Sequence, residues 1–161
     1  MSAPYDSCLV ARYIVATAND RDIYINLTKV QKLLYVAYGV WLAIVSDTPL
    51  VNEKPQAWPY GPVFPKTRKY LMANELYLMK LDDSDFNELK QDENFIGLID
   101  FVFLHWGHLT AGQLTSWSHM DGSPWEEATM KEGFDWGDRI SDTSIKSYFR
   151  YKALRRKDDG N

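Results

Sequence analysis

The sequence predicts a mainly α-helical protein, a single compact helical domain with a short irregular or β-like insertion around residues 49–65. Three observations predict this class. Apolar residues recur at helical spacing in several segments, most of which follow a residue that can cap a helix. Four prolines lie within residues 55–65, where they disfavour regular helix. The chain has 161 residues, 45% of them hydrophobic, which suits one core.

The first half of the chain contains two predicted helices. Residues 6–19 form the first, with Asp6 or Ser7 as its N-cap. Residues 28–46 form the second, with Thr28 as its N-cap. Beyond its first turn, apolar residues run almost all round this second helix, which predicts burial on most of its sides.

The middle of the chain is less regular. Residues 65–73 are predicted to be helical, because a proline is tolerated in the first turn of a helix. Residues 76–89 are ambiguous, and the YLMKL within them fits a short strand or an extended link. Residues 92–108 form a strongly apolar helix, and Asp92 and Glu93 suit the positive end of its dipole.

Three further helices are predicted toward the C-terminus. Thr110 caps a short one, and Ser123 caps the next, with Pro124 at its first position. After a loop, GFDWGDRI, residues 141–157 form the last helix. Its basic end complements the negative helix terminus and consists of Arg155, Arg156 and Lys157. Residues 151–161 are therefore expected to be a basic helix end followed by a polar tail.

The charge of the chain disfavours nucleic acid as a partner. Its 18 basic and 22 acidic residues give a net charge of −4, whereas proteins that hold phosphates usually carry a basic patch. Basic residues cluster as KTRK at 66–69 and KALRRK at 152–157. Ordinary solvated helix charge is the favoured interpretation of both clusters.

Several other classes of protein are disfavoured. The lone Cys8 excludes an internal disulfide and a zinc site built on cysteines. The N-terminal MSAPYDSCLVARY lacks the basic and apolar regions of a signal peptide. The longest apolar runs are interrupted by charges and fall short of a membrane span. We therefore expect a cytoplasmic protein with no membrane contact.

The sequence contains little that predicts catalysis. Motifs for phosphate loops, dinucleotides, zinc proteases and serine hydrolases are all missing. His105, His108 and His119 could bind zinc in a metalloenzyme, but structural roles are favoured for them. Glu126 and Glu127 are better explained as first-turn helix charges than as an acid–base pair. We expect no enzyme, no cofactor and no metal.

Four segments, taken in order, resemble the Panacea domain, the family of SocA-like antitoxins and phage-associated GepA-type proteins. The family pattern has a K-x-Q-K-L-L-Y helix, then A-W-x-Y-G-P-V, then a segment ending in [ST]-H that leads to P-W, and a final I-x-x-Y-F helix. The matching segments are Lys29 to Tyr35, Ala57 to Val63, Leu114 to His119 with Pro124 and Trp125, and Ile145 to Phe149. Pro59 and Ser118 depart from the usual residues.

The resemblance implies that residues 1–161 are one Panacea domain with a core of about 7–150. It implies an antitoxin without enzyme activity, whose partner is a toxin encoded nearby. In one branch of the family the antitoxin presents its toxin to the ClpXP protease, and a phage setting is common. It also draws attention to the motif residues as a candidate partner-binding set: Trp58, Tyr60, Gly61, Pro62, His119, Pro124 and Trp125.

Physical properties of the proline-rich segment are compatible with binding and with scaffolding. Prolines fix the backbone before a partner arrives, which lowers the cost of ordering, and Trp58 and Tyr60 are residue types that dominate binding hot spots. The same rings could instead fill gaps between helices. We predict that the segments around Trp58 and Trp125 lie near each other and frame one face.

Two other functions stay open at this point. A DNA-binding regulator is one, because the segment from Thr110 to Ala128 could be mistaken for a helix-turn-helix. A phage-encoded protein that acts on a host factor is the other.

Overall fold

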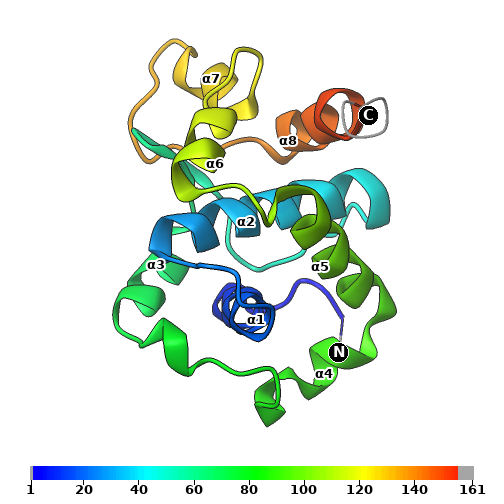
Figure 1. Cartoon of the computed structure of the whole chain (residues 1–161). Helices are drawn as coiled ribbons and strands as arrows, with labels where there is room; N and C mark the ends of the chain where they lie inside the picture. Colours follow the sequence, from blue (N-terminus) through cyan, green and yellow to red (C-terminus); the bar gives the residue numbers. More distant parts are fainter. Residues whose placement is uncertain (1, 156–161) are drawn as a thin grey trace.

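The computed structural model describes residues 2–155, in which helices surround the central helix α2 (Figure 1). In chain order the elements are α1 (Ser7–Asp20), α2 (Leu27–Val40), β1 (Gln56–Trp58), β2 (Gly61–Val63), α3 (Pro65–Met72), α4 (Asn87–Gln91), α5 (Glu93–Trp106), α6 (Ala111–Ser118), α7 (Pro124–Thr129) and α8 (Asp142–Tyr148). The prediction of a mainly helical, single compact domain with a small β-like insertion is confirmed.

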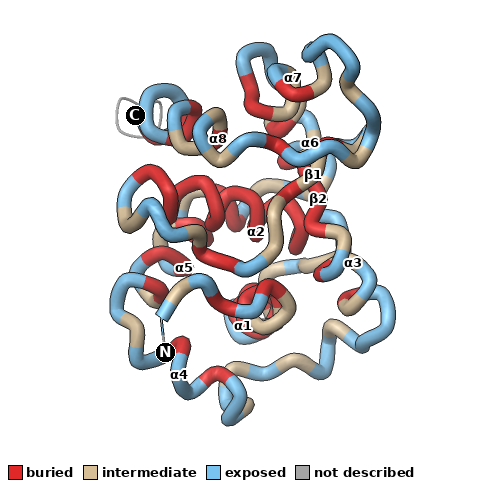
Figure 2. The backbone as a smooth tube through the Cα atoms, turned by 180° about the vertical axis from the view of Figure 1, so that it is seen from behind, coloured by how far each residue is buried: buried red, intermediate tan, exposed pale blue. Residues whose placement is uncertain are grey.

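Burial concentrates on α2. This helix contacts α1, α3, α5, α6, α8 and β2. Figure 2 shows it buried along nearly its whole length, with α1 on one side and α6, α7 and α8 on the other. Such burial is what an apolar pattern around the full circumference predicts, and it makes α2 the shared packing partner of five other helices and β2.

The starts of α1 and α2 differ in how well the sequence predicted them. Asp6 caps α1, accepting a hydrogen bond from the Cys8 amide at 2.9 Å. Thr28 was the wrong choice for α2, because Asn26 is the N-cap and accepts from the Lys29 amide at 2.9 Å. Asn26 has extended backbone angles, whereas Thr28 already lies inside the helix.

Two helices continue as π-helical segments. After Val40 the helical path goes on as Trp41–Val45, so the predicted length to residue 46 is nearly right although the hydrogen bonding changes. After Tyr148, α8 continues as Phe149–Ala153. Of the predicted basic end, Arg155 is described, whereas Arg156 and Lys157 lie outside the described residues.

The proline-rich insertion forms a β-hairpin. Strands β1 and β2 are antiparallel, with Cα partners Gln56↔Val63, Ala57↔Pro62 and Trp58↔Gly61. The far edge of β1 is also occupied, because the Ala57 amide donates to Asp138 O at 2.8 Å and the Gly137 amide donates to Ala57 O at 2.9 Å. The predicted loop GFDWGDRI therefore lies against β1.

The ambiguous region contains no strand. Residues Leu76–Leu78 and Ser84–Phe86 form 3₁₀ turns, and α4 follows them. The Asn19 side chain donates to the carbonyl oxygens of Leu76 and Met79, each at 3.0 Å. A helix side chain thus satisfies main-chain groups that a partner strand would otherwise have bonded.

Side-chain caps define the later helices. Thr110 forms a reciprocal capping box with Gln113 at the start of α6. Ser123 accepts from the Glu126 amide at 3.2 Å, with Pro124 at the first position of α7. Both caps confirm the sequence prediction. Within residues 2–155 no single helix is long and apolar enough to cross a membrane, although α5 and α6 reach that length together across a 98° bend.

Candidate functional site

The two motif segments meet where β1 faces α7. The Trp125 indole N–H donates to the main-chain oxygen of Trp58 at 2.7 Å, a contact between residues 67 positions apart. Figure 2 shows β1 and β2 next to α6 and α7. The prediction that the segments around Trp58 and Trp125 lie near each other is confirmed.

Aromatic rings extend outward from this junction. His119 packs against Trp125 with ring centroids 4.3 Å apart and planes at 33°. Trp136 follows at 6.2 Å from Trp125, and Phe134 lies 5.1 Å from Trp136. We call this set the aromatic face, which consists of Trp58, Tyr60, His119, Trp125, Phe134 and Trp136.

The aromatic face is partly open to solvent. The side chain of Tyr60 is 75% exposed and that of Trp136 is 57% exposed. Trp58, His119 and Trp125 are half-buried. In contrast, Ala57 and the β2 residues between Gly61 and Val63 are buried. The insertion is therefore both scaffold and surface, with its buried positions fixing where the exposed rings lie.

Gly61 permits the tight turn that presents Tyr60. Its φ of +112° lies in a region that side-chain-bearing residues rarely adopt. A Cβ atom at this position would lie 2.7 Å from the Ser118 hydroxyl oxygen and 3.1 Å from the Lys32 side chain. The hairpin thus packs directly on α6 and α2, with no room for a larger residue.

Polar side chains of α2 hold the hairpin from below. The Phe64 amide donates to Gln31 Oε1 at 2.8 Å, and the Gln31 side-chain amide donates back to Phe64 O at 3.3 Å. Lys32 Nζ donates to Pro62 O at 3.1 Å. Lys29 Nζ donates to Gly107 O at 2.8 Å, at the end of α5. The K-x-Q-K residues therefore fasten β2 and α5 to the central helix.

Burial shifts the pKa of one group beneath the aromatic face, Lys32, and of one group within it, His119. It lowers the pKa of Lys32 to about 8. The pKa of His119 is also lowered, first by burial and then by the nearby Lys32 charge, while a backbone hydrogen bond with Tyr60 acts in the opposite direction. His119 Nε2 is buried and has no hydrogen-bond partner among residues 2–155. Burial thus favours the neutral form of the imidazole, which adds a ring to the aromatic face.

The predicted site residues have two kinds of placement. Trp58, Tyr60, His119 and Trp125 contribute side chains to the aromatic face. Gly61, Pro62 and Pro124 are buried or shape the backbone beneath it. The structure thus brings all seven predicted residues into one region, whose binding role stays a prediction.

Sequence reasoning missed two members of the aromatic face and one of its neighbours. Trp136 and Phe134 were assigned only to a loop, and Arg68, whose guanidinium lies 5.5 Å from the centre of the Trp58 ring, was grouped with solvated charge. The sequence contains one signal for this loop, because Gly133 and Gly137 flank Trp136. In the structure both glycines have positive φ angles. A tryptophan held in a glycine-shaped loop is a candidate for contact with a partner.

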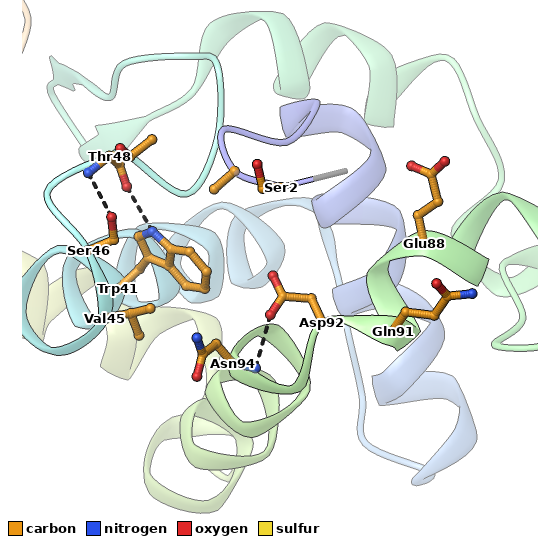
Figure 3. A pocket seen from close by; sticks show the side chains of 10 residues that line it. Ser2, Trp41, Val45, Ser46, Thr48, Glu88, Gln91, Asp92 and Asn94 are labelled. Atoms are coloured by element: carbon orange, nitrogen blue, oxygen red, sulfur yellow. Dashed lines mark hydrogen bonds between the residues drawn. The ribbon is translucent and has the colours of Figure 1, made fainter.

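The other candidate sites offer less. Within residues 2–155 no three His, Cys, Asp or Glu side chains gather as metal ligands, and the ring of His105 instead packs 4.4 Å from Phe101. Figure 3 shows a pocket of about 610 Å³ between the end of α2 and the α4–α5 junction. Its Asp92 carboxylate already accepts from Tyr5 Oη and from the Asn94 and Phe95 amides.

The structure thus defines a small, mainly helical protein with an exposed aromatic surface on a fixed hairpin. The chain belongs to the antitoxin SocA-like, Panacea domain family, whose model matches residues 30–126. It is 32% identical over 160 residues to antitoxin SocA of Caulobacter vibrioides (strain NA1000 / CB15N). The alignment covers 92% of this chain and 85% of that protein. No solved structure matches the chain significantly.

The family match confirms the resemblance and includes most of the site. Trp58, Tyr60, His119 and Trp125 lie within residues 30–126, whereas Phe134 and Trp136 lie beyond it. Family membership supports an antitoxin role for the chain.

Proposed function

We propose that this protein is an antitoxin that neutralises a toxin by direct binding and that the aromatic face is the contact surface. The observation that carries the proposal is the exposure of Tyr60 and Trp136 on fixed backbone. The Trp125–Trp58 and Gln31–Phe64 hydrogen bonds fix the hairpin that carries Tyr60, and the loop that carries Trp136 bonds to Ala57 of the same hairpin. Tyrosine and tryptophan are enriched among residues that dominate binding energy. A backbone fixed before binding reduces the ordering cost.

The proposed role has no catalytic step. Binding is the step shared by two routes of neutralisation, namely masking of the toxin and its delivery to a protease such as ClpXP. The toxin is expected to be the product of an adjacent gene. Membership of an antitoxin family and the likeness to antitoxin SocA support this partner class.

Co-expression tests the proposal. The adjacent gene product alone should arrest growth, and the wild-type protein should restore it. A Tyr60→Ala, Trp136→Ala double variant should fail to restore growth. The matched control is Tyr24→Ala, Tyr77→Ala, because these tyrosines are similarly exposed, at 76% and 67%, but lie outside the aromatic face. A harmless neighbour, or full rescue by the double variant on the aromatic face, would contradict the proposal.

A further inference from the structure

Three arginines in the described residues lie over aromatic rings. The distance from guanidinium carbon to ring centre is similar in each pair. It is 5.4 Å for Arg12 and Phe86, 5.3 Å for Arg21 and Phe103, and 5.5 Å for Arg68 and Trp58. A ring face attracts a cation and limits the orientations of the planar guanidinium.

Two of these arginines also hold carboxylates. Arg12 pairs with Asp83 at 2.6 Å and with Asp85 at 3.0 Å. Arg21 pairs with Asp100 at 2.6 Å. A ring on one side and a carboxylate at the N–H groups is therefore the arrangement that this protein uses for ring-stacked arginines.

Arg68 lacks the carboxylate. Within residues 2–155 its side chain makes no ion pair and no hydrogen bond, although it is half-buried beside Trp58. Five N–H donors thus remain on a side chain whose orientation the indole ring already restricts.

A second cation lies beneath the aromatic face. Lys32 lies buried below Gly61, and no described carboxylate forms an ion pair with it. Two acidic groups of the adjoining loops are bonded to main-chain amides, and Asp135 lies between Phe134 and Trp136. Glu126 Oε1 accepts from the Gly122 amide at 3.0 Å, and Asp138 Oδ2 accepts from the Asp135 amide at 3.0 Å.

We propose that the toxin supplies the missing carboxylate: an acidic side chain of the partner binds Arg68 while a neighbouring apolar group packs on Trp58 and Tyr60. A guanidinium donates two parallel hydrogen bonds to a carboxylate, which gives both strength and a fixed direction. This inference rests on the proposed function, because it takes the aromatic face as the contact surface. A protein partner is favoured over nucleic acid, since the net negative charge repels a polyanion.

Nuclear magnetic resonance with peptide probes tests the inference without the toxin. The probes are the acetylated peptide amide Glu-Phe-Glu-Glu and two counterparts in which glutamine or lysine replaces each glutamate. The acidic peptide should shift the Trp58 indole N–H and Arg68 side-chain signals of ¹⁵N-labelled protein. It should bind at least about fivefold more tightly than the glutamine peptide, and added salt should reduce this difference.

Two arginine variants provide matched evidence. Arg68→Gln should weaken binding of the acidic peptide at least about fivefold. Arg21→Gln removes the same charge from another ring-stacked arginine and should leave the affinity unchanged. If thermal unfolding shows that Arg68→Gln is destabilised, Arg68→Lys is used as the deciding variant because it keeps the positive charge. Lysine lacks the paired donors of a guanidinium, so Arg68→Lys should still bind the acidic peptide several-fold more weakly than the wild type.

Four results would overturn the inference: equal binding of the acidic and glutamine peptides, wild-type affinity in the deciding Arg68 variant, shifts confined to another surface, or tighter binding of a single-stranded oligonucleotide at the same site. Its failure is distinguishable from failure of the proposed function. Failure of the inference appears in the peptide titration, whereas failure of the proposed function appears as a lack of growth rescue on co-expression.

Discussion

Trp125 donates its indole N–H to the main-chain oxygen of Trp58 at 2.7 Å, and this one bond joins α7 to the β-hairpin. The bond leaves the Trp58 side chain free to interact elsewhere, where it donates to Gln56 Oε1 at 3.0 Å and lies under Arg68. The two tryptophans that the family pattern shares are thus part of one structural unit.

Replacing Trp125 with phenylalanine tests that unit. Trp125→Phe keeps an aromatic ring but removes the donor, so the half-buried Trp58 carbonyl loses its partner. We expect a loss of about 1–2 kcal/mol in the free energy of unfolding, measured by urea denaturation. Trp136→Phe, at an exposed ring, should change the same quantity by less than about 0.5 kcal/mol. Equal effects of the two substitutions would show that the hydrogen bond contributes nothing.

Two glycines respond oppositely to alanine. Gly61→Ala introduces a Cβ 2.7 Å from the Ser118 hydroxyl at a φ of +112°, and we expect it to destabilise the fold by about 1–3 kcal/mol. Gly97 lies exposed inside α5 with nothing within 4 Å of an added Cβ. Gly97→Ala should therefore stabilise the protein by about 0.5–1 kcal/mol. Thermal unfolding of both variants distinguishes local backbone strain from a general effect of added methyl groups.

Stability should depend on pH through Lys32. Its folded pKa of about 8 lies below the 10.5 of a free lysine, so between these values the folded state binds fewer protons than the unfolded state. Stability therefore rises with pH across this window, by about 1–2 kcal/mol between pH 8 and roughly 9.5. Above pH 10 the buried Tyr35 acts in the opposite direction, because its pKa is raised by burial.

A Lys32→Met variant isolates this contribution. The pKa of Lys29 is also lowered by burial and adds in the same direction, so the slope of the wild type alone is not diagnostic. Urea denaturation from pH 7 to 9.5 should show a flatter dependence in Lys32→Met than in the wild type. Parallel curves would mean that Lys32 keeps its proton in the fold.

Tyr60 separates stability from function. Its side chain is 75% exposed, so Tyr60→Ala should leave the free energy of unfolding within about 0.5 kcal/mol of the wild type. If the aromatic face binds the toxin, the same substitution should weaken the complex at least about tenfold in a direct binding assay. Tyr77→Ala, at 67% exposure in a remote turn, should leave both quantities unchanged. An unaltered affinity in Tyr60→Ala would remove this ring from the contact surface.

Local patterns were sufficient to predict most helices of this fold. The caps at Thr110 and Ser123 follow from the sequence because each uses neighbours within three residues. For the first helix the sequence left Asp6 and Ser7 open, and the structure shows that Asp6 is the cap. Asn26 was missed since two potential caps, Asn26 and Thr28, lie close together, and only the backbone angles decide between them. The 3₁₀ turns near Leu76 depend on a distant helix side chain, Asn19, which no local pattern indicates.

The site was predicted only in part for the same reason. Motif residues identified the hairpin and the start of α7, but the contributions of Trp136 and Arg68 depend on how the loop and α3 pack against β1. The sequence indicated Lys32 only as part of the K-x-Q-K-L-L-Y segment. Its burial against Pro62 is a tertiary contact over 30 positions and was not predictable from periodicity.

Hydrogen exchange of the complex with the adjacent gene product tests the central claim most directly. Binding through the aromatic face predicts that main-chain amides in β1, β2 and the loop from Phe134 to Arg139 exchange at least about tenfold more slowly in the complex. Amides of the turn around Tyr77 should exchange at the same rate in both states. Protection confined to that turn or to another surface, with the aromatic face unchanged, would contradict the account.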